Sequence, residues 1–179
     1  MKKNIALIGY MGTGKTTLGK KIARRLEMDF IDTDQCIEKR QGRTITEIFE
    51  TEGEAVFRKM ERDLLKELCE QENLLISTGG GIILDPINRK RLKEKTFLVT
   101  LTARPGSIYK RVKNSKKRPL LQTEDLFGKI VGMMKKRRPF YEIGHIIVKT
   151  DTMSEGKAVT GIIEAYDKFC KDENLYISQ

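Results

Sequence analysis

The chain has 179 residues, a length that suits a single domain with one open sheet covered by helices. Hydrophobic residues make up 39% and charged residues 34% of it, which argues against a disordered chain, and no apolar run approaches the ~18 residues of a membrane span. The formal net charge of +10 favours anionic partners, either a nucleic acid or small anionic substrates.

The start of the chain and its cysteines predict a cytoplasmic protein. The first apolar run follows Met1-Lys2-Lys3 directly, which leaves no room for a signal peptide. Cys36, Cys69 and Cys170 are odd in number and far apart, so we interpret them as reduced thiols rather than as a disulfide framework or a metal site. The single His145 precedes an apolar strand, where a structural role is expected.

The first predicted elements are a strand, a glycine-rich loop and a helix. Apolar residues 4–8 predict a buried parallel strand, and the helical spacing of Leu18, Ile22 and Leu26 predicts a helix over residues 16–26. Residues 9–16 between them satisfy the pattern G-x-x-x-x-G-K-[ST], which is a phosphate-binding P-loop. This stretch therefore predicts binding of a nucleoside triphosphate.

Each residue type in the P-loop has a physical purpose. The glycines let backbone N–H groups wrap a polyphosphate, Lys15 supplies a charge for the β- and γ-phosphates, and the Thr16 hydroxyl is a suitable oxygen ligand for Mg²⁺. The predicted nucleotide-binding residues of this loop are Gly12, Thr13, Gly14, Lys15, Thr16 and Thr17.

The second predicted strand ends at residues 29–34 and carries two carboxylates. Alternation along a strand would place Asp32 and Asp34 on one face at its carboxyl end, where α/β sheets bind ligands. One carboxylate would lie near Mg²⁺ and the other would accept a proton or hydrogen bond from an attacking hydroxyl. Because Ser77 stands at the end of the third strand, Asp32 is the expected acidic partner of the metal. An Asx turn or a helix cap is the alternative.

Three short helices are predicted between the second and third strands. They cover residues 37–41, 46–51 and 54–68, with breaks at Gly42 and Gly53, and they could hold a second substrate. Arg58 and Glu61 lie three residues apart on one helix face, which indicates either a substrate site or an ordinary solvated salt bridge.

The rest of the chain continues the alternation of strands and helices. Strands are predicted at residues 74–78, 96–101 and 146–148, and helices are predicted from residues 85 and 105 and over residues 125–136 and 155–171. The glycines at residues 79–81 would let a ligand approach the backbone closely. The pattern predicts a three-layer α/β/α fold with a five-stranded parallel sheet.

Basic residues gather near the predicted site. Residues 113–123 have the composition of a mobile lid, on which Arg118 could close on the γ-phosphate. Arg137 and Arg138 suggest a clamp for a carboxylate or phosphate. The basic clusters are not interleaved with aromatic residues, so small anionic substrates are favoured over a nucleic acid.

The sequence resembles the shikimate kinase family, a member of the P-loop group related to nucleoside monophosphate kinases. The resemblance covers nearly the whole chain and rests on several motifs in order: residues 9–16, 30–34 (Phe-Ile-Asp-Thr-Asp), 42–45 (Gly-Arg-Thr-Ile), 48–49, Gly53-Glu54 with Phe57-Arg58 and Glu61, 78–81 (Thr-Gly-Gly-Gly), 118–121 (Arg-Pro-Leu-Leu), and Arg137 with 139–141 (Pro-Phe-Tyr).

The resemblance implies a role for each matched position. It implies Mg²⁺-dependent transfer of the ATP γ-phosphate to the 3-hydroxyl of shikimate, with Asp34 as the partner of that hydroxyl. Further implied roles are a carboxylate clamp (Arg58 and Arg137), a residue that holds Arg58 or touches the substrate (Glu61), a backbone donor (Gly80), a lid cation (Arg118), an adenine contact (Arg111), and phosphate and metal binding (Lys15, Thr16 and Asp32, with Ser77).

Two other readings stay open. A gluconate-type or other small-metabolite kinase could use the same scaffold, since Asp34, Arg58 and Arg137 would fit any hydroxy acid of the right size. A non-catalytic nucleotide-binding or RNA-binding protein would use the positive charge but would not need Asp34 and Arg118 together. We expect a monomer without a nucleic-acid or membrane partner.

Overall fold

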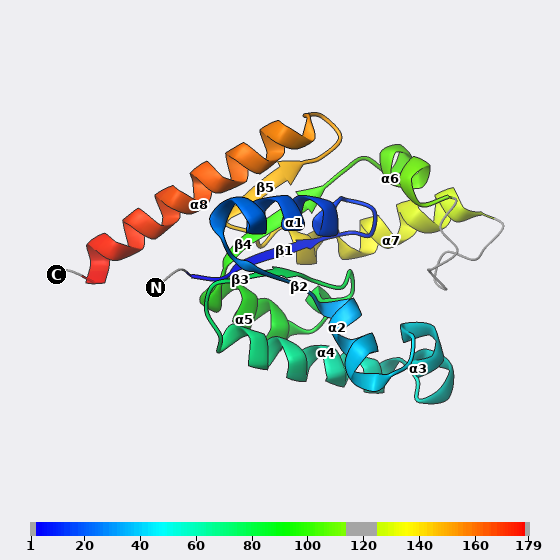
Figure 1. The fold of residues 1–179 in the computed structure, drawn as a ribbon. Helices are drawn as coiled ribbons and strands as arrows, with labels where there is room; N and C mark the ends of the chain where they lie inside the picture. Colours follow the sequence, from blue (N-terminus) through cyan, green and yellow to red (C-terminus); the bar gives the residue numbers. More distant parts are fainter. Residues whose placement is uncertain (1–2, 114–124, 178–179) are drawn as a thin grey trace.

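One parallel sheet organises the molecule. The computed structural model describes residues 3–113 and 125–177, and these contain a five-stranded sheet between helices, as predicted (Figure 1). The strands lie in the order β2-β3-β1-β4-β5 and all run in parallel. Their bounds are Ile5–Gly9 (β1), Asp29–Asp32 (β2), Leu74–Ser77 (β3), Phe97–Thr102 (β4) and Ile146–Lys149 (β5).

The strand β1 lies at the centre of the sheet and brings the P-loop to the middle of its carboxyl edge. Leu7 of β1 is in register with Ser77 of β3, and Gly9 is in register with Leu101 of β4. Asp32 of β2 is also in register with Ser77. The residues that follow β1, β2 and β3 therefore meet at one edge, where ligands of open α/β sheets bind.

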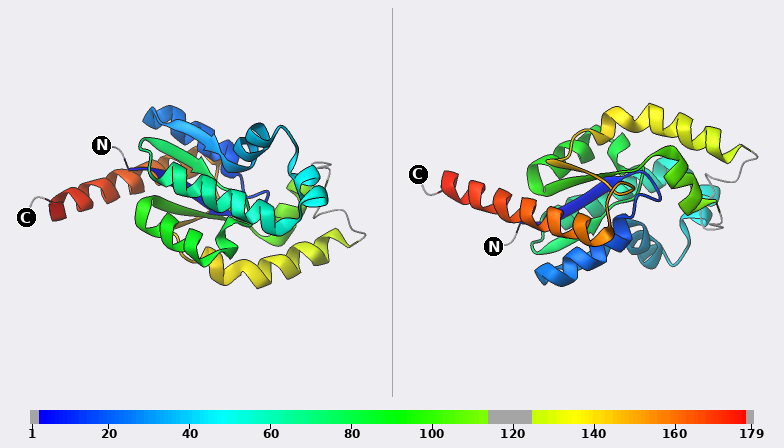
Figure 2. Two further views of the ribbon diagram at one scale, coloured as in Figure 1. Left: turned by 90° about the horizontal axis from the view of Figure 1, so that it is seen from below. Right: turned by 90° about the horizontal axis from the view of Figure 1, so that it is seen from above.

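Helices cover both faces of the sheet (Figure 2). The helices α1 (Lys15–Leu26) and α8 (Glu155–Ile177) cover one face, and α4 (Glu54–Cys69), α5 (Pro86–Lys95) and α7 (Leu126–Tyr141) cover the other. A hydrophobic core lies on each face of the sheet, and alternate residues of β1 pack into one or the other. Ile5 and Leu7 face α1 and α8, whereas Ala6 and Ile8 face the opposite layer. Such two-sided burial explains why the strands read as continuous apolar runs.

The predicted helices between β2 and β3 are present as α2 (Thr33–Gln41), α3 (Ile45–Thr51) and α4. Gly42 and Gly53 adopt φ values of 63° and 82°, which L side chains rarely take, and they separate the three helices. A capping box formed by Thr44 and Glu47 fixes the start of α3. The remaining helices are the 3-10 turn η1 (Ile82–Leu84) and α6 (Pro105–Val112).

Several predicted boundaries were wrong: α2 begins at Thr33 rather than at residue 37, α8 continues to Ile177 rather than to residue 171, and two further differences have a clear physical cause. The strand β2 ends at Asp32 rather than at residue 34, because Asp32 caps α2 by accepting a hydrogen bond from the Gln35 N–H at 3.4 Å. The helix α7 does not end near residue 136 but continues through Pro139 to Tyr141. Tertiary contacts hold this last turn in spite of the proline, since the Tyr141 carbonyl accepts a 2.8 Å hydrogen bond from Thr100 of β4.

His145 is structural, as predicted. Its Nδ1 accepts a hydrogen bond from the Leu98 N–H at 2.9 Å, and its ring contacts the rings of Phe97 and Phe169. Within residues 3–113 and 125–177, none of the helices combines the length and the apolar character that crossing a bilayer requires.

Candidate active site

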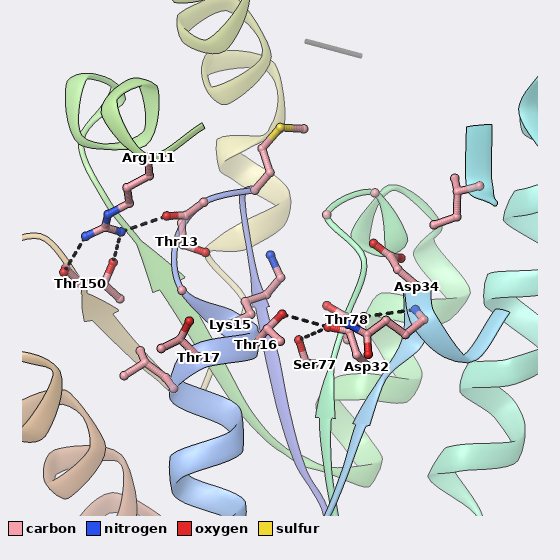
Figure 3. A pocket seen from close by; sticks show the side chains of 18 of the residues that line it. Thr13, Lys15, Thr16, Thr17, Asp32, Asp34, Ser77, Thr78, Arg111 and Thr150 are labelled. Carbon is pink, nitrogen blue, oxygen red and sulfur yellow. Dashed lines mark hydrogen bonds between the residues drawn. The ribbon is translucent and has the colours of Figure 1, made fainter. Parts of the chain in front are cut away.

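A cavity of about 890 Å³ lies at the carboxyl edge of the sheet. It is lined by every predicted site residue that the structure describes: Gly12, Thr13, Gly14, Lys15, Thr16, Thr17, Asp32, Asp34, Arg58, Glu61, Gly80, Arg111 and Arg137. The predicted lid at residues 113–123, with Arg118, lies outside the described residues except for Lys113. Figure 3 shows Arg111 and Asp34 on opposite sides of this cavity, with Lys15 between them.

We distinguish two parts of the cavity. We name them by the roles that the sequence predicts: the nucleotide half consists of residues 12–17, Arg111 and Thr150, and the acceptor half consists of Asp34, Arg58, Glu61, Gly80 and Arg137.

The P-loop has the geometry of a phosphate cradle. Gly12 and Gly14 adopt φ values of 75° and 95°, so a side chain at either position would be strained. Gly14 is the N-cap of α1 and has no side chain to occupy the first N–H groups of the helix. Lys15 Nζ donates hydrogen bonds to the carbonyls of Gly9 at 2.7 Å and Tyr10 at 3.2 Å. The first turn of α1 and an ammonium group therefore lie together at the centre of the sheet edge, an arrangement that suits an anion.

Three oxygen-bearing side chains meet beside the P-loop. The Asp32 Oδ2 accepts hydrogen bonds from the Thr16 hydroxyl at 2.9 Å and from the Ser77 hydroxyl at 3.3 Å (Figure 3). Such a set of hard oxygens fits Mg²⁺, which usually takes one or two protein ligands and completes its shell with water and phosphate oxygens. The described residues contain no cluster of three or more His, Cys, Asp or Glu that could hold a metal.

Arg111 connects the P-loop to the segment after β5. Its Nη1 donates to the Gly12 carbonyl at 2.9 Å and to the Thr150 hydroxyl at 3.1 Å, and its Nη2 donates to the Thr150 carbonyl at 3.1 Å. The planar guanidinium is thus fixed at the nucleotide half of the cavity, where it can present a face to a base.

Asp34 reaches the cavity from a helix and not from a strand, which corrects the prediction that it shares a strand face with Asp32. It lies in the first turn of α2, where the partial positive charge of the helix N-terminus favours a carboxylate. Its Oδ1 lies so close to Gly79 that a Cβ at that position would overlap it.

Arg58 and Glu61 form a buried ion pair, so the simple alternative of a solvated salt bridge does not describe them. Arg58 Nη1 lies 2.5 Å from Glu61 Oε2, and the Glu61 side chain is only 1% exposed. Arg58 also donates from Nε and Nη2 to Glu54 Oε1, at 3.1 and 2.7 Å. Two carboxylates therefore fix the plane of one guanidinium.

Glu61 is an unusual carboxylate. Burial raises its pKa from 4.5 to about 7, against the opposing effect of Arg58. The nearby charge of Asp34 contributes to the same rise. Its Oε1 has no hydrogen-bond partner within the part of the chain that the structure describes. This free oxygen lies next to Gly79, on the same side as Asp34.

The glycines after β3 make room for side chains as well as for a ligand. A Cβ on Gly79 would overlap the carboxylates of Asp34 and Glu61, and a Cβ on Gly81 would overlap the Arg58 guanidinium. Neither φ angle lies in the left-handed region, so space rather than backbone conformation requires glycine here.

The two adjacent arginines of α7 point in different directions. Arg137 lines the cavity and donates from Nη1 to the Gly80 carbonyl at 3.3 Å. The Arg138 side chain is 80% exposed and pairs with Glu142 at 2.8 Å. Of the two, Arg137 is the one that the structure brings to the acceptor half.

Sequence reasoning missed three residues that hold the site together. The Thr33 hydroxyl accepts a hydrogen bond from the Gly79 N–H at 2.8 Å, Thr150 binds Arg111, and the Tyr141 hydroxyl donates to the Gly80 carbonyl at 2.6 Å. Only Tyr141 had a local signal, because it follows Arg137 by one helical turn and so shares its face.

Comparison with known proteins identifies the family. A family model described as shikimate kinase matches residues 11–167. A shikimate kinase of Pelotomaculum thermopropionicum is 47% identical over 172 residues, which cover 96% of this chain and 98% of the relative. The structure of a shikimate kinase from Acinetobacter baumannii in complex with shikimate has a TM-score of 0.88 and 37% identity, and the match covers 92% of this chain and 93% of that one.

A gluconokinase from Sinorhizobium meliloti is similar in fold alone. Its TM-score is 0.61 at 17% identity, over 99% of this chain and 97% of that one. The chain therefore belongs to the shikimate kinase family of ATP-dependent kinases.

Proposed function

We propose that this chain transfers the γ-phosphate of ATP to the 3-hydroxyl of shikimate, and that Asp34 receives that hydroxyl. The observation that carries the proposal is the position of Asp34, which stands across the cavity from Lys15 (Figure 3). Its carboxylate also lies beside that of Glu61, the partner of Arg58, at Gly79. Phosphoryl transfer depends mainly on in-line positioning and on neutralising charge. A carboxylate that accepts the hydroxyl proton, facing an ammonium that binds the transferred phosphate, supplies both.

The acceptor half fits a small hydroxy acid. Arg58 and Arg137 are two guanidinium groups that can bind a carboxylate, and the Gly80 backbone N–H is a further donor. Arg58 is held by Glu54 and Glu61 before any ligand arrives, so it loses little side-chain freedom on binding. Glu61 keeps one oxygen unpaired within the described residues, and this oxygen can accept a hydrogen bond from a substrate hydroxyl.

The nucleotide half would bind ATP together with Mg²⁺. Residues 12–17 would surround the phosphates, with Lys15 at the β- and γ-phosphates and Arg111 against the adenine. Thr16 would hold the metal directly and Asp32 would hold it with Ser77, partly through water. When bound, the metal neutralises charge on the β- and γ-phosphate oxygens. Asp32 itself orients the Thr16 hydroxyl.

We propose further that residues 1–179 form one kinase domain. Residues 35–68 would be its substrate-binding insert, because Arg58 and Glu61 belong to α4, and residues 113–123 would be its lid, with Arg118 as a catalytic cation at the γ-phosphate. A monomer in the cytoplasm is expected, since one chain brings all the described site residues to a single cavity and none of the three cysteines forms a disulfide.

The direct test is ADP release by the purified protein with ATP and Mg²⁺. Shikimate, gluconate and no acceptor are compared at several salt concentrations. Strong stimulation by shikimate alone is expected, and stimulation by gluconate alone would contradict the proposed acceptor. A titration with labelled RNA at the same salt concentrations tests the alternative that the chain uses its +10 charge to bind RNA. No binding at physiological salt is expected.

A further inference from the structure

Tyr141 is a buried tyrosine that contacts the loop after β3. It is the last residue of α7 and is 7% exposed. Two hydrogen bonds hold it at opposite ends: its carbonyl accepts from the Thr100 hydroxyl at 2.8 Å, and its own hydroxyl donates to the Gly80 carbonyl at 2.6 Å. Tyr141 therefore connects β4, the end of α7 and the loop after β3.

The Gly80 carbonyl receives a second hydrogen bond from the same helix. Arg137 precedes Tyr141 by four residues, so the two side chains lie on one face of α7. Arg137 Nη1 donates to the same carbonyl at 3.3 Å. A carbonyl oxygen has two lone pairs, and both are used here. The shorter bond comes from Tyr141, so the tyrosine sets the position of the oxygen to which Arg137 also binds.

The neighbouring peptide groups of this loop are held as well. The Gly79 N–H donates to Thr33 at 2.8 Å, and the Gly79 carbonyl accepts from the Ile82 N–H at 3.3 Å. The Gly79 carbonyl and the Gly80 N–H belong to one planar peptide and point in opposite directions. The orientation of the Gly80 N–H is thus fixed from both sides, by the bond to the Gly79 carbonyl and by the bond from Tyr141 to the next carbonyl.

We propose that Tyr141 is a positioning residue for the acceptor. By holding the Gly80 carbonyl, to which Arg137 also binds, it fixes the Arg137 guanidinium relative to the Gly80 N–H. This rests on the proposed acceptor-binding roles of Arg137 and Gly80. A glycine-rich loop is otherwise free to rotate its peptide planes, and a rotation would separate the two donors. Burial raises the pKa of the Tyr141 phenol, so the hydroxyl remains a donor over the working pH range.

The test replaces the hydroxyl alone. Tyr141→Phe should raise the KM for shikimate about tenfold, the effect of one lost hydrogen bond, while the KM for ATP stays within about twofold and kcat falls less than the KM rises. Tyr166→Phe is the matched control, because Tyr166 is also buried and its hydroxyl donates at 2.6 Å to a carbonyl, that of Lys3, on the other face of the sheet. This control should shift the melting temperature without changing either KM.

A second variant approaches Tyr141 from its other side. Thr100→Val removes the bond to the Tyr141 carbonyl and leaves the phenol in place. It should raise the KM for shikimate in the same direction and by less, about threefold. This variant keeps the proposal open to disproof if Tyr141→Phe folds poorly.

A double-mutant cycle with Arg137 distinguishes a positioning role of Tyr141 from a general loss of order around the site. Arg137→Ala alone should raise the KM for shikimate strongly, and adding Tyr141→Phe to it should cost less than about threefold more, because one of the two donors that Tyr141 positions is gone and only the Gly80 N–H remains. Equal effects of Tyr141→Phe in both backgrounds, or an effect no larger than that of Tyr166→Phe, would overturn the inference. If Arg137→Ala itself leaves the KM unchanged, the proposed clamp fails, and this result is recognised without the tyrosine variants.

Discussion

The two halves of the cavity are built in different ways. Most of the nucleotide half comes from one continuous stretch, residues 12–17, and its shape depends on backbone conformation at Gly12 and Gly14. The acceptor half takes its side chains from α2, α4 and α7 and places them around the loop after β3. A contiguous loop can recognise phosphate in many proteins, whereas a site assembled from distant elements can be fitted to one acceptor.

The largest effect should follow from changing Asp34, the carboxylate that we propose receives the acceptor hydroxyl. Asp34→Asn should lower kcat by about 10²- to 10⁴-fold, the usual contribution of a general base, while the Kd of an ATP analogue stays within about twofold. Steady-state kinetics and calorimetric titration of the analogue measure the two quantities. If kcat and the affinity for the ATP analogue fell equally, the result would contradict the prediction that Asp34 acts on the acceptor and not on the nucleotide.

The next effect concerns space rather than charge. Gly79→Ala places a methyl group against Asp34 and Glu61 and should lower kcat/KM for shikimate by about 100-fold, because both carboxylates have to move away from the acceptor. Binding of an ATP analogue should be nearly unchanged. Gly132→Ala is the control, since a Cβ on this α7 glycine meets nothing within 4 Å and should stabilise the helix by about 0.5–1 kcal/mol.

The adjacent arginines offer a sharper comparison. Arg137→Lys keeps the charge but loses the planar fork, and we expect the KM for shikimate to rise about 10- to 50-fold, as for the loss of a hydrogen bond to a charged group. Arg138→Lys should change the KM less than twofold, because Arg138 is exposed and pairs with Glu142. The reverse ranking would show that Arg138 is the clamp.

Arg111 tests the nucleotide half alone. Arg111→Ala removes the bonds to Gly12 and Thr150 and should raise the KM for ATP about 5- to 10-fold. The KM for shikimate, measured at saturating ATP, should stay within about twofold of the wild type. A comparable rise in both KM values would mean that the halves are coupled through the P-loop.

The last effect is on stability rather than on activity, a pH dependence caused by Glu61. Its pKa is about 7 in the folded state and 4.5 ordinarily, so the folded state holds the extra proton between these values. Stability should therefore fall as the pH rises from 4.5 to 7, with a slope from this group of at most about 1.4 kcal/mol per pH unit.

Urea unfolding of the wild type and of Glu61→Gln at several pH values measures this difference. The variant should lack this part of the slope. Glu54→Gln is the control, because it removes the other carboxylate partner of Arg58 while Glu61 stays titratable. An identical slope in the wild type and in Glu61→Gln would contradict the raised pKa.

The order of the strands and helices could be predicted because local patterns determine it. The continuous apolar runs, the P-loop and the breaks at Gly42 and Gly53 give the elements nearly as they are found. The end of β2 and the last turn of α7 could not be predicted, since an Asp cap and the contacts of Tyr141 override the local preference there.

The candidate site was predicted as a set of residues but not as a geometry. The family resemblance named Asp34, Arg58, Glu61 and Arg137, and all four line the cavity. Their mutual placement depends on contacts between residues far apart in sequence, such as Gly79 with Thr33, 46 positions apart, and Gly80 with Tyr141, 61 positions apart. A local sequence pattern cannot predict contacts between residues so far apart in the sequence.

The crowded glycines after β3 also bear on resistance to inhibitors. Gly79 is surrounded by two carboxylates and Gly81 by a guanidinium, so almost any substitution at these positions displaces a side chain that the acceptor half uses. A compound that rests against this loop would face a surface that single mutations cannot reshape without loss of activity. Compounds that depend on exposed groups such as Arg138 would have no such protection, and escape variants should arise there first.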